Sequence, residues 1–400
     1  MSQFNALYTL LTSVAPACEF QKKRIEGIGE INTIDDFCDL VPFTTKAELV
    51  ADFAAHPPYG SNLTYPLERY TRFCQTSGTS AAPLPVLDTN ESWDWMLMNW
   101  AGVYAAAGLD KGDRVYFAFS FGPFLGFWTA YEASVRCGYL SIPGGGLSSA
   151  ARLEAIFKNK TSVLCCTPTY ALHLAEVAQK EGRSMHDSPV RKIIVAGEPG
   201  GSIAAVRERI SVAWNGAVVF DHYGMTETGP VAYQRLGESD TLHIIEESYF
   251  AEIIDPITTQ QADVGEIGEL VLTPLGRHAW PLLRYRTGDL VKRKKAYGFV
   301  LDGGIIGRVD DMVVIRGVNV YPSAVDALIR QHSAAEYRVT VQQRKSMPEI
   351  ALEIESTEPR FAQVIEKAFE ITFTLRVSVE VVPPGSLPRY ELKAKRWIKE

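Results

Sequence analysis

The sequence predicts an α/β protein with a largely parallel sheet, followed by a small α+β unit. Between residues 114 and 224, short apolar segments typical of buried strands alternate with amphipathic segments of helical period. Such alternation requires crossover connections between parallel strands. From about residue 243 the apolar segments become shorter and are separated by turn residues, which predicts a β-rich part. The final stretch of about ninety residues has the length of an independently folding domain.

The spacing of apolar residues predicts the individual elements. At the N-terminal end, Phe4, Leu7, Leu10, Leu11 and Val14 share one helical face, which favours an amphipathic helix packed on the body. We expect strands at 114–120, 162–168, 191–201 and 217–224, with helices at 124–138 and 170–182. In the C-terminal unit we expect helices at 323–331 and 360–370, and strands at 337–343, 349–356 and 376–382.

Composition narrows the class of protein. The 400 residues are 46% hydrophobic and 22% charged, which is a globular profile. A net charge of −7 argues against a nucleic-acid partner, because such binding needs clustered Lys and Arg. Six cysteines without CxxC spacing suit a reducing compartment. The start lacks the basic segment of a signal peptide and no apolar stretch is long enough to cross a bilayer, so we expect a cytoplasmic protein that does not bind membranes.

Four loops lie where an α/β sheet would bind a ligand. They are "TSGTSAAPLPV" (76–86), "AGEPGG" (196–201), "HYGMTETGP" (222–230) and "YRTGDL" (285–290). Taken singly, each could be an ordinary turn or helix cap. Together they supply amides and hydroxyls for phosphates, a planar ring for a base, and carboxylates for a metal or a ribose. The chain has neither a P-loop nor a dinucleotide fingerprint, so the loops indicate a nucleotide site of another kind.

These motifs, in their order along the chain, resemble those of the adenylate-forming enzyme superfamily. The resemblance includes "TSGTS", "AGEP", "YGMTE", "YRTGDL", "GRVDDMVVIRGVNVYP" and the terminal "SLPRYELKAKRW". Within the superfamily, "VPFTTKAEL" (41–49), "RGVNVYPSAVD" and "SLPR" are most similar to the phenylacetate–CoA ligase branch. The resemblance implies a large N-terminal adenylate-forming domain (1–309) with mostly parallel sheets and a β-rich subdomain. A small, mobile α+β C-terminal domain (310–400) would follow it.

The resemblance also implies an activity and its small-molecule partners. ATP and a carboxylic acid would form an acyl-adenylate with release of pyrophosphate, and the thiol of coenzyme A would then displace AMP. Mg²⁺ would accompany ATP, held through Glu227 and the phosphates. Some members of this branch hold zinc shortly after the Tyr-Gly motif, but 231–243 has no Cys and only His243, so we expect no zinc. Relatives are often dimers, which makes a homodimer possible.

The nucleotide-binding residues that the resemblance implies come from the four loops and from "GRVDD", with Arg308 expected near the ribose and the phosphate. Those of the first loop would hold the phosphates, Tyr223 would lie against the adenine, and Asp289 would accept the ribose hydroxyls. The full set is Ser77, Gly78, Thr79, Ser80, Gly197, Glu198, Pro199, Tyr223, Gly224, Asp289 and Arg308.

The catalytic and substrate-facing residues are implied in the same way. Lys393 would bridge the carboxylate and the α-phosphate, with Thr226 and Glu227 beside that phosphate. Asp310 would be the hinge between domains, and Gly317 would line the passage for coenzyme A. The acyl pocket would include Phe119, Phe121, Gly144 and Gly145. Its aromatic lining favours an aryl or arylacetic acid, although the same aromatics could be plain core.

Several alternatives remain open at this stage. Only the register from "SLPR" selects Lys393, because Leu392 stands where the family has glycine, so Lys395 is a second candidate. Ala81 likewise replaces a usual glycine in the phosphate loop. The acceptor could be a carrier-protein thiol or an amine instead of coenzyme A. The chain could also be a nucleotide-binding protein without ligase turnover.

Overall fold

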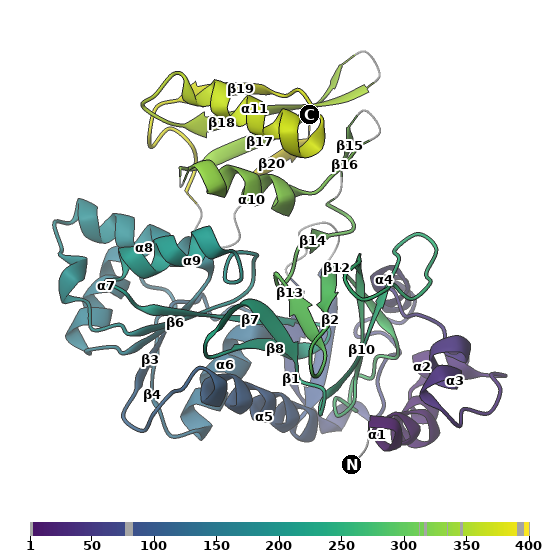
Figure 1. The fold of residues 1–400 in the computed structure, drawn as a ribbon. Coiled ribbons are helices and arrows are strands. Elements are labelled where there is room, and N and C mark those ends of the chain that lie inside the picture. The colour runs from purple at the N-terminus through teal and green to yellow at the C-terminus, as the bar shows by residue number, and fades with distance from the viewer. Residues whose placement is uncertain are drawn as a thin grey trace.

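The computed structural model describes residues 3–76, 83–311, 313–315, 318–333, 335–344, 347–389 and 396–399. Figure 1 shows a large lower body made of helices and strands, and a smaller upper body formed by the C-terminal end of the chain. No helix among these residues is long and apolar enough to cross a membrane. The α/β fold class expected from the sequence is confirmed.

Five parallel strands form one half of the main sheet. Their order is β4 (Leu140–Pro143), β3 (Arg114–Phe117), β5 (Val163–Cys166), β6 (Lys192–Val195) and β7 (Val218–Met225). The central strands β3, β5 and β6 are buried on both faces, which explains their nearly continuous apolar sequences, whereas the edge strand β4 is partly exposed.

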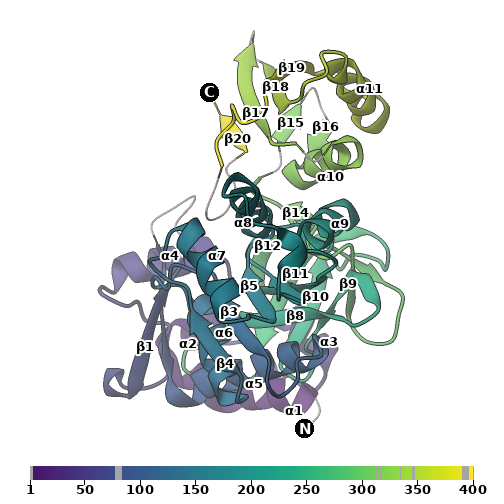
Figure 2. The same ribbon diagram turned by 90° about the vertical axis from the view of Figure 1, so that its left-hand side faces the viewer.

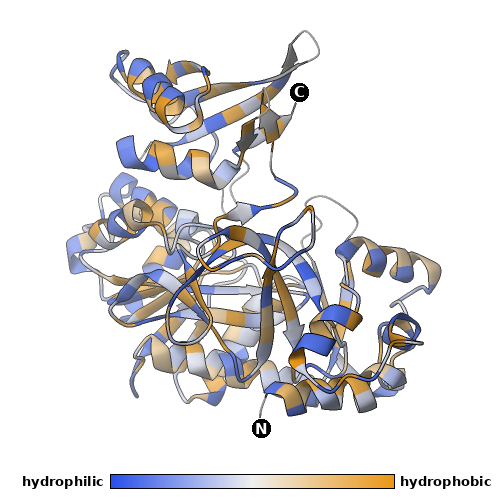
Figure 3. Ribbon diagram, turned by 45° about the vertical axis from the view of Figure 1, so that its right-hand side comes forward, coloured by the Kyte–Doolittle hydropathy of each residue, from blue (hydrophilic) through white to orange (hydrophobic). Residues whose placement is uncertain are grey.

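Helices cover both faces of the parallel strands. On one side lie α5 (Asn90–Ala106) and α6 (Leu125–Arg136), and on the other α7 (Ser149–Lys158), α8 (Pro168–Lys180) and α9 (Ala204–Ala213). Side chains alternate between the two cores as strand geometry demands: Val115 and Phe117 face α5 and α6, whereas Tyr116 packs with α7 and α8. Figure 3 shows hydrophobic residues concentrated on the strands, while the helices carry both hydrophobic and hydrophilic residues.

The β-rich part continues the same sheet. After β7 the order is β8 (Gly229–Arg235), β9 (Glu238–Ile244), β13 (Val300–Asp302), β12 (Tyr285–Lys294), β11 (Ile267–Pro274) and β10 (Tyr249–Ile254), all antiparallel to their neighbours. The short β14 (Gly307–Arg308) pairs with β12. The antiparallel part therefore begins at residue 229, before the change at about residue 243 that the sequence predicted. The first half of β9 is polar and exposed, so it lacks the apolar pattern that marks a strand.

The N-terminal region packs against the β-rich end. It contains α1 (Gln3–Thr9), a π-helical turn (Leu10–Val14), a 3-10 turn (Ala15–Ala17), α2 (Glu19–Ile25), α3 (Ile34–Leu40) and α4 (Lys46–Ala55). A 3-10 turn (Leu67–Arg69) then leads into the hairpin β1 (Tyr70–Gln75) and β2 (Pro85–Thr89). Leu7, Leu10, Leu11 and Val14 are buried in one cluster with Phe250, which confirms the amphipathic N-terminal helix.

The C-terminal part has its own sheet and core. Following the hairpin β15 (Val313–Ile315) and β16 (Val318–Val320), it contains α10 (Pro322–His332), β17 (Tyr337–Arg344), β18 (Met347–Glu355), α11 (Phe361–Phe373), β19 (Ser378–Val382) and β20 (Trp397–Lys399). The strand order is β19-β18-β17-β20. The view turned by 90° places this part above α8 and α9 (Figure 2).

Candidate functional site

Parallel pairing brings the predicted ligand loops to one edge of the sheet. Cys166 pairs with Val195, and Val195 pairs with Asp221 on the next strand. β5 and β6 therefore end together, residues 196–201 follow β6, and β7 continues past the same edge through residues 222–225. Ligands of open α/β sheets bind beyond this edge.

Tyr223, Asp289 and Arg308 form one bonded group. The Tyr223 hydroxyl donates to Oδ2 of Asp289 at 2.6 Å, and Nη1 of Arg308 donates to Oδ1 of the same carboxylate at 3.0 Å. Burial, together with Asp289, raises the pKa of Tyr223 well above its usual value. Burial alone would lower the pKa of Arg308, but Asp289 and Asp310 raise it, so the guanidinium stays charged. The structure thus brings together the residues predicted to face the adenine and the ribose.

Asp310 lies directly beside this group. Its Oδ1 accepts a hydrogen bond from Nε of Arg308 at 2.8 Å, and its Oδ2 accepts one from Nη2 at 3.3 Å. Arg308 therefore joins the buried Asp289 to the more exposed Asp310, at the point where the chain leaves β14 for the C-terminal part. A change of backbone direction at Asp310 would act on the Asp289 contact through this arginine.

Glu227 forms a second polar centre with Lys46. The Lys46 ammonium lies 3.2 Å from Oε1 of Glu227, and the Tyr285 hydroxyl donates to the same oxygen at 3.4 Å. The Glu227 side chain is 7% exposed, whereas that of Lys46 is 38% exposed. Lys46 begins α4, whose capping box at Thr45 and Glu48 fixes the start of the helix. Carboxylate oxygens are among the ligands that Mg²⁺ prefers, so the chemistry of the Glu227 side chain fits this ion.

Arg277 holds the segment that carries Thr226 and Glu227. Its Nη1 donates to the carbonyl oxygens of Thr226 at 2.8 Å and of Glu227 at 2.9 Å. The same guanidinium forms a two-pronged ion pair with Asp88 on β2, at 2.8 Å and 2.5 Å. Both side chains are buried, so this pair fixes the backbone on which Glu227 stands.

The loop at residues 196–201 packs against the start of α8. Glu198 accepts hydrogen bonds from the backbone nitrogen of Thr169 at 2.8 Å and from the Thr169 hydroxyl. Gly197 has a φ of +91°, a conformation that favours glycine. Gly224 leaves no room for a side chain, since a Cβ there would lie 2.7 Å from the carbonyl oxygen of Gly229. These loops are held by the helix and strands behind them.

The four residues predicted for the acyl pocket lie together at the ends of β3 and β4. A Cβ on Gly145 would lie 3.0 Å from the Phe121 ring, and one on Gly144 would lie 2.6 Å from the Tyr116 ring. Phe121 has a φ of +51°, which is unusual for a bulky residue. Around it, Phe119, Trp128 and Tyr131 make edge-to-face ring contacts. Buried Arg152 joins the two loops by donating to the carbonyl oxygens of Gly144 at 2.9 Å and Phe119 at 3.5 Å.

Part of the predicted site falls outside the described residues. These residues are the phosphate loop, the glycine of the coenzyme A passage and the lysine of the first step: Ser77, Gly78, Thr79, Ser80, Gly317 and Lys393. Pro199, at the other end of the predicted adenine wall, lines a cavity between α8 and the C-terminal part.

Lys46, Arg277 and Arg152 were not predicted as site residues. Lys46 lies within "VPFTTKAEL", which contributed to the family resemblance, but a helix-capping pattern was its only local signal. Arg277 and Asp88 are 189 residues apart, and no local pattern links them. Arg152 reads as one polar residue of an amphipathic helix until the fold buries it.

His222 gives the site a pH-dependent stability. Its ring is buried, with Nδ1 2.9 Å from the carbonyl oxygen of Ala232 and the ring centroid 4.2 Å from that of Trp100. Burial lowers its pKa to about 4. In the unfolded chain His222 binds a proton below about pH 6.5, whereas in the folded chain it does so only below about pH 4. The free energy of unfolding therefore falls as pH falls through this window. Burial raises the pKa of neighbouring Asp221 to about 6, which acts in the opposite direction over part of the window.

We expect the His222→Asn variant to lose less stability than the parent protein between pH 7 and pH 4.5. The difference should approach roughly 2.5 kcal/mol at pH 4.5, since one pKa unit corresponds to about 1.4 kcal/mol. Urea unfolding at a series of pH values measures it. Parallel pH profiles for the two proteins would show that His222 is not the group responsible.

The mixed sheet, the separate C-terminal sheet and the loops gathered at one edge define an adenylate-forming enzyme. Two family models match the chain: AMP-binding enzyme over residues 68–274 and AMP-binding enzyme C-terminal domain over residues 317–400. The chain belongs to the AMP-binding enzyme family. It is similar to the phenylacetate-coenzyme A ligase of Escherichia coli (strain K12), with 30% identity over 388 residues that cover 90% of this chain and 86% of the relative. The resemblance found in the motifs is confirmed.

The structure is also similar to solved structures of 2-hydroxyisobutyryl-CoA ligase. In the postadenylation state with 2-HIB-AMP, that ligase matches with a TM-score of 0.93 at 27% identity, covering 100% of this chain and 89% of the other. In the thioesterification state with 2-HIB-AMP and CoA, the TM-score is 0.74 at 28% identity, with the same coverage. The arrangement of the two parts therefore corresponds to the first of these states.

Proposed function

We propose that the chain is an ATP-dependent acid–CoA ligase that works through an acyl-adenylate. In the first step a carboxylate oxygen of the acid attacks the α-phosphorus of ATP, and pyrophosphate leaves. In the second step the sulfur of coenzyme A attacks the acyl carbon, the thiol loses its proton, and AMP leaves. The observation that supports this function best is the bonded group of Tyr223, Asp289 and Arg308 beside Glu227, in a member of a family whose matched relatives are acid–CoA ligases.

The nucleotide would lie along the edge of the sheet. We place the adenine between Tyr223 and residues 197–199, the ribose on Asp289, and the phosphates toward Thr226 and the loop at residues 77–80. Glu227 is the residue that would hold Mg²⁺ together with the phosphates, and the bound ion would neutralise phosphate charge. Lys46 already lies at that carboxylate, so it would neighbour the phosphates as well.

The two parts of the chain would change their arrangement between the steps. We place the boundary between residues 309 and 310, with Asp310 as the hinge. The first arrangement would bring Lys393 to the reacting phosphate, and the second would bring Gly317 to the passage for coenzyme A. A cytoplasmic location and a homodimer stay predictions from the sequence.

The acid we propose is an aryl or arylacetic acid. The residues at the ends of β3 and β4 are aromatic, and the rings around Phe121 pack edge to face, an arrangement that also suits an aromatic ligand. Arg152, buried behind these loops, has its guanidinium hydrogen-bonded to backbone oxygens and to the Tyr170 hydroxyl. The lining that remains for the acyl group is therefore largely apolar.

Pyrophosphate release tests this function. The enzyme is supplied with ATP, Mg²⁺ and a panel of aryl, arylacetic and short aliphatic acids, with and without coenzyme A. We expect release that depends on an aromatic acid and continues over many turnovers only when coenzyme A is present. Release that ignores coenzyme A would point to a carrier-protein thiol or an amine as acceptor. ATP binding without release for any acid would overturn the ligase function.

A further inference from the structure

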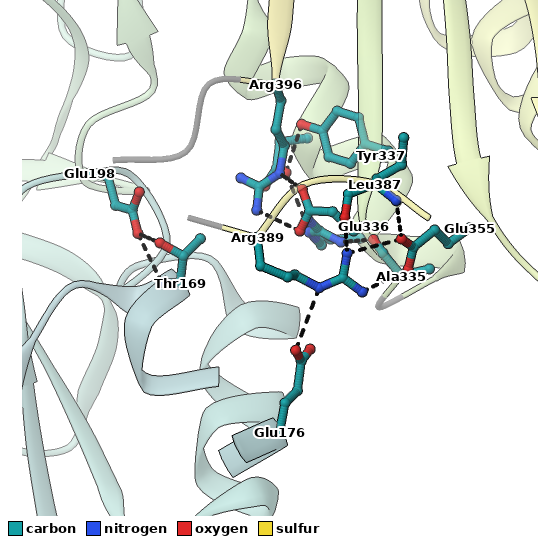
Figure 4. Close-up of polar contacts among 12 residues, drawn as sticks. Thr169, Glu176, Glu198, Ala335, Glu336, Tyr337, Glu355, Leu387, Arg389 and Arg396 are labelled. Atoms are coloured by element: carbon teal, nitrogen blue, oxygen red, sulfur yellow. Dashed lines mark hydrogen bonds and ion pairs between the residues drawn. The ribbon is translucent and has the colours of Figure 1, made fainter. Parts of the chain in front are cut away.

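A cavity of about 350 Å³ separates the C-terminal part from α8 and α9. Charged side chains of both parts line it: Glu176 and Arg209 from the helices below, and Asp326, Arg330, Glu336, Glu355, Arg389 and Arg396 from above. Figure 4 shows the polar contacts around it. Most of the upper charges pair within their own part, as Arg396 does with Glu336 at 3.1 Å.

Arg389, from the upper part, forms an ion pair with α8 below. Its guanidinium is fixed by Glu355, whose two carboxylate oxygens accept hydrogen bonds at 2.9 Å and 2.8 Å. The Glu355 side chain is only 4% exposed, and it also accepts from the backbone nitrogen of Leu387 at 2.8 Å. Nε of Arg389 then lies 3.5 Å from Oε2 of Glu176 on α8. The fixed arginine presents its Nε to the opposite part (Figure 4).

The position of this contact in the chain ties it to the first reaction step. Arg389 stands four residues before Lys393, in the segment "RYELK". On the other side, the first turn of α8 contains Thr169, whose backbone nitrogen donates to Glu198 of the nucleotide loop. The Glu176–Arg389 contact therefore connects the segment leading to Lys393 with the helix that supports the nucleotide loop.

Arg209 on α9, unlike Arg389, lies at the cavity near another positive charge. It lines the same cavity opposite Arg330, and the structure shows no hydrogen bond or ion pair from it to any described residue. Burial and the nearby Arg330 lower its pKa to about 10, against the attraction of Glu176 and Glu336. Burying a charged guanidinium beside another one costs free energy. Arg209 therefore disfavours the arrangement in which the C-terminal part lies over α8 and α9.

We propose that Arg389 and Glu176 are positioning residues for adenylation: their ion pair holds the C-terminal part over α8, and Arg209 opposes it. The proposal rests on the proposed two-step function, and on the better match of this arrangement to a postadenylation structure than to a thioesterification structure. The Glu176 side chain is 41% exposed, so the pair is weak. A weak pair suits an enzyme that must release this arrangement in every turnover.

The two half-reactions, measured separately, test the proposal. Adenylation is followed as pyrophosphate release in a single turnover without coenzyme A, and thiolation as the decay of preformed acyl-adenylate after coenzyme A is added. For Glu176→Gln we expect the ratio of the adenylation to the thiolation rate to fall about two- to fivefold, as the strength of a half-exposed ion pair allows. The charge-reversed Glu176→Lys should lower this ratio further. Arg209→Met should raise it.

The control is Glu208→Gln on α9, because Glu208 lines the neighbouring groove and the described part of the chain shows no ion pair for it. Its ratio should equal that of the parent. An unchanged ratio in both Glu176 variants, with both half-reactions running in the parent, would overturn the proposal while leaving the ligase function intact. A shift of the same sign for Glu176→Gln and Arg209→Met would also overturn it. A parent that forms no pyrophosphate would instead contradict the function itself.

Discussion

Replacing Lys393 with alanine is expected to slow acyl-adenylate formation by a factor of about 10² to 10³, the usual cost of removing one preorganised charge at a transition state. The ammonium would stabilise negative charge that grows as the carboxylate attacks the α-phosphorus, so its loss acts on that step. Thiolation of preformed acyl-adenylate should keep most of its rate, because the resemblance gives Lys393 a role only in the first step. Rapid-quench measurement of both half-reactions checks this.

Lys395→Ala is the matched control for Lys393→Ala. The two lysines lie two residues apart in the same basic segment, so both variants remove one charge from it. We expect Lys395→Ala to change adenylation by less than about threefold, because Lys395 is not the residue that the motif register assigns to the reacting phosphate. The reverse result, a large loss for Lys395→Ala and a small one for Lys393→Ala, would move the catalytic role to Lys395.

The buried strands could be predicted, because each is marked by a short apolar run in the sequence. Val115, Tyr116 and Phe117 form an apolar run in the sequence, and such a run indicates a buried strand. In the structure their side chains alternate between the two cores. The family resemblance placed Tyr223 and Asp289 in one nucleotide site, and the structure shows them in contact on strands of the same sheet. The junction at β7 was harder to predict. This strand pairs in parallel with β6 and antiparallel with β8, and the direction of a neighbouring strand leaves no mark on an apolar segment.

The contacts that hold the site could not be predicted, because they join distant segments. The chain has 40 Lys and Arg residues, and nothing near Glu227 or Asp88 indicates which of them will be its partner. Lys46 and Arg277 are selected only when the N-terminal helices and the β-rich strands close on the sheet. Similarly, Glu198 was expected in the adenine wall, while its bonds to the first turn of α8 depend on the spacing of two parallel strands.

Arg277 is the supporting residue whose loss should cost most stability. Arg277→Met leaves the Asp88 carboxylate buried without its partner, and breaking a buried pair from one side costs about 3–5 kcal/mol. Urea unfolding measures this loss. Arg69→Met, which removes the exposed partner of Glu91, is the matched control and should cost less than about 1 kcal/mol. Equal losses in the two variants would show that the buried pair gives no special support.

A double variant separates the role of Arg277 in stability from its role in the site. Asp88→Leu combined with Arg277→Met removes both charges, and an apolar replacement of a buried ion pair is often neutral or stabilising. Much of the stability should therefore return. Binding of ATP should not recover, because the carbonyl oxygens of Thr226 and Glu227 still lack the donor that fixed their segment. A double variant that regained stability and the parent KM for ATP together would show that Arg277 serves only the core, and that the segment carrying Glu227 holds its shape without it.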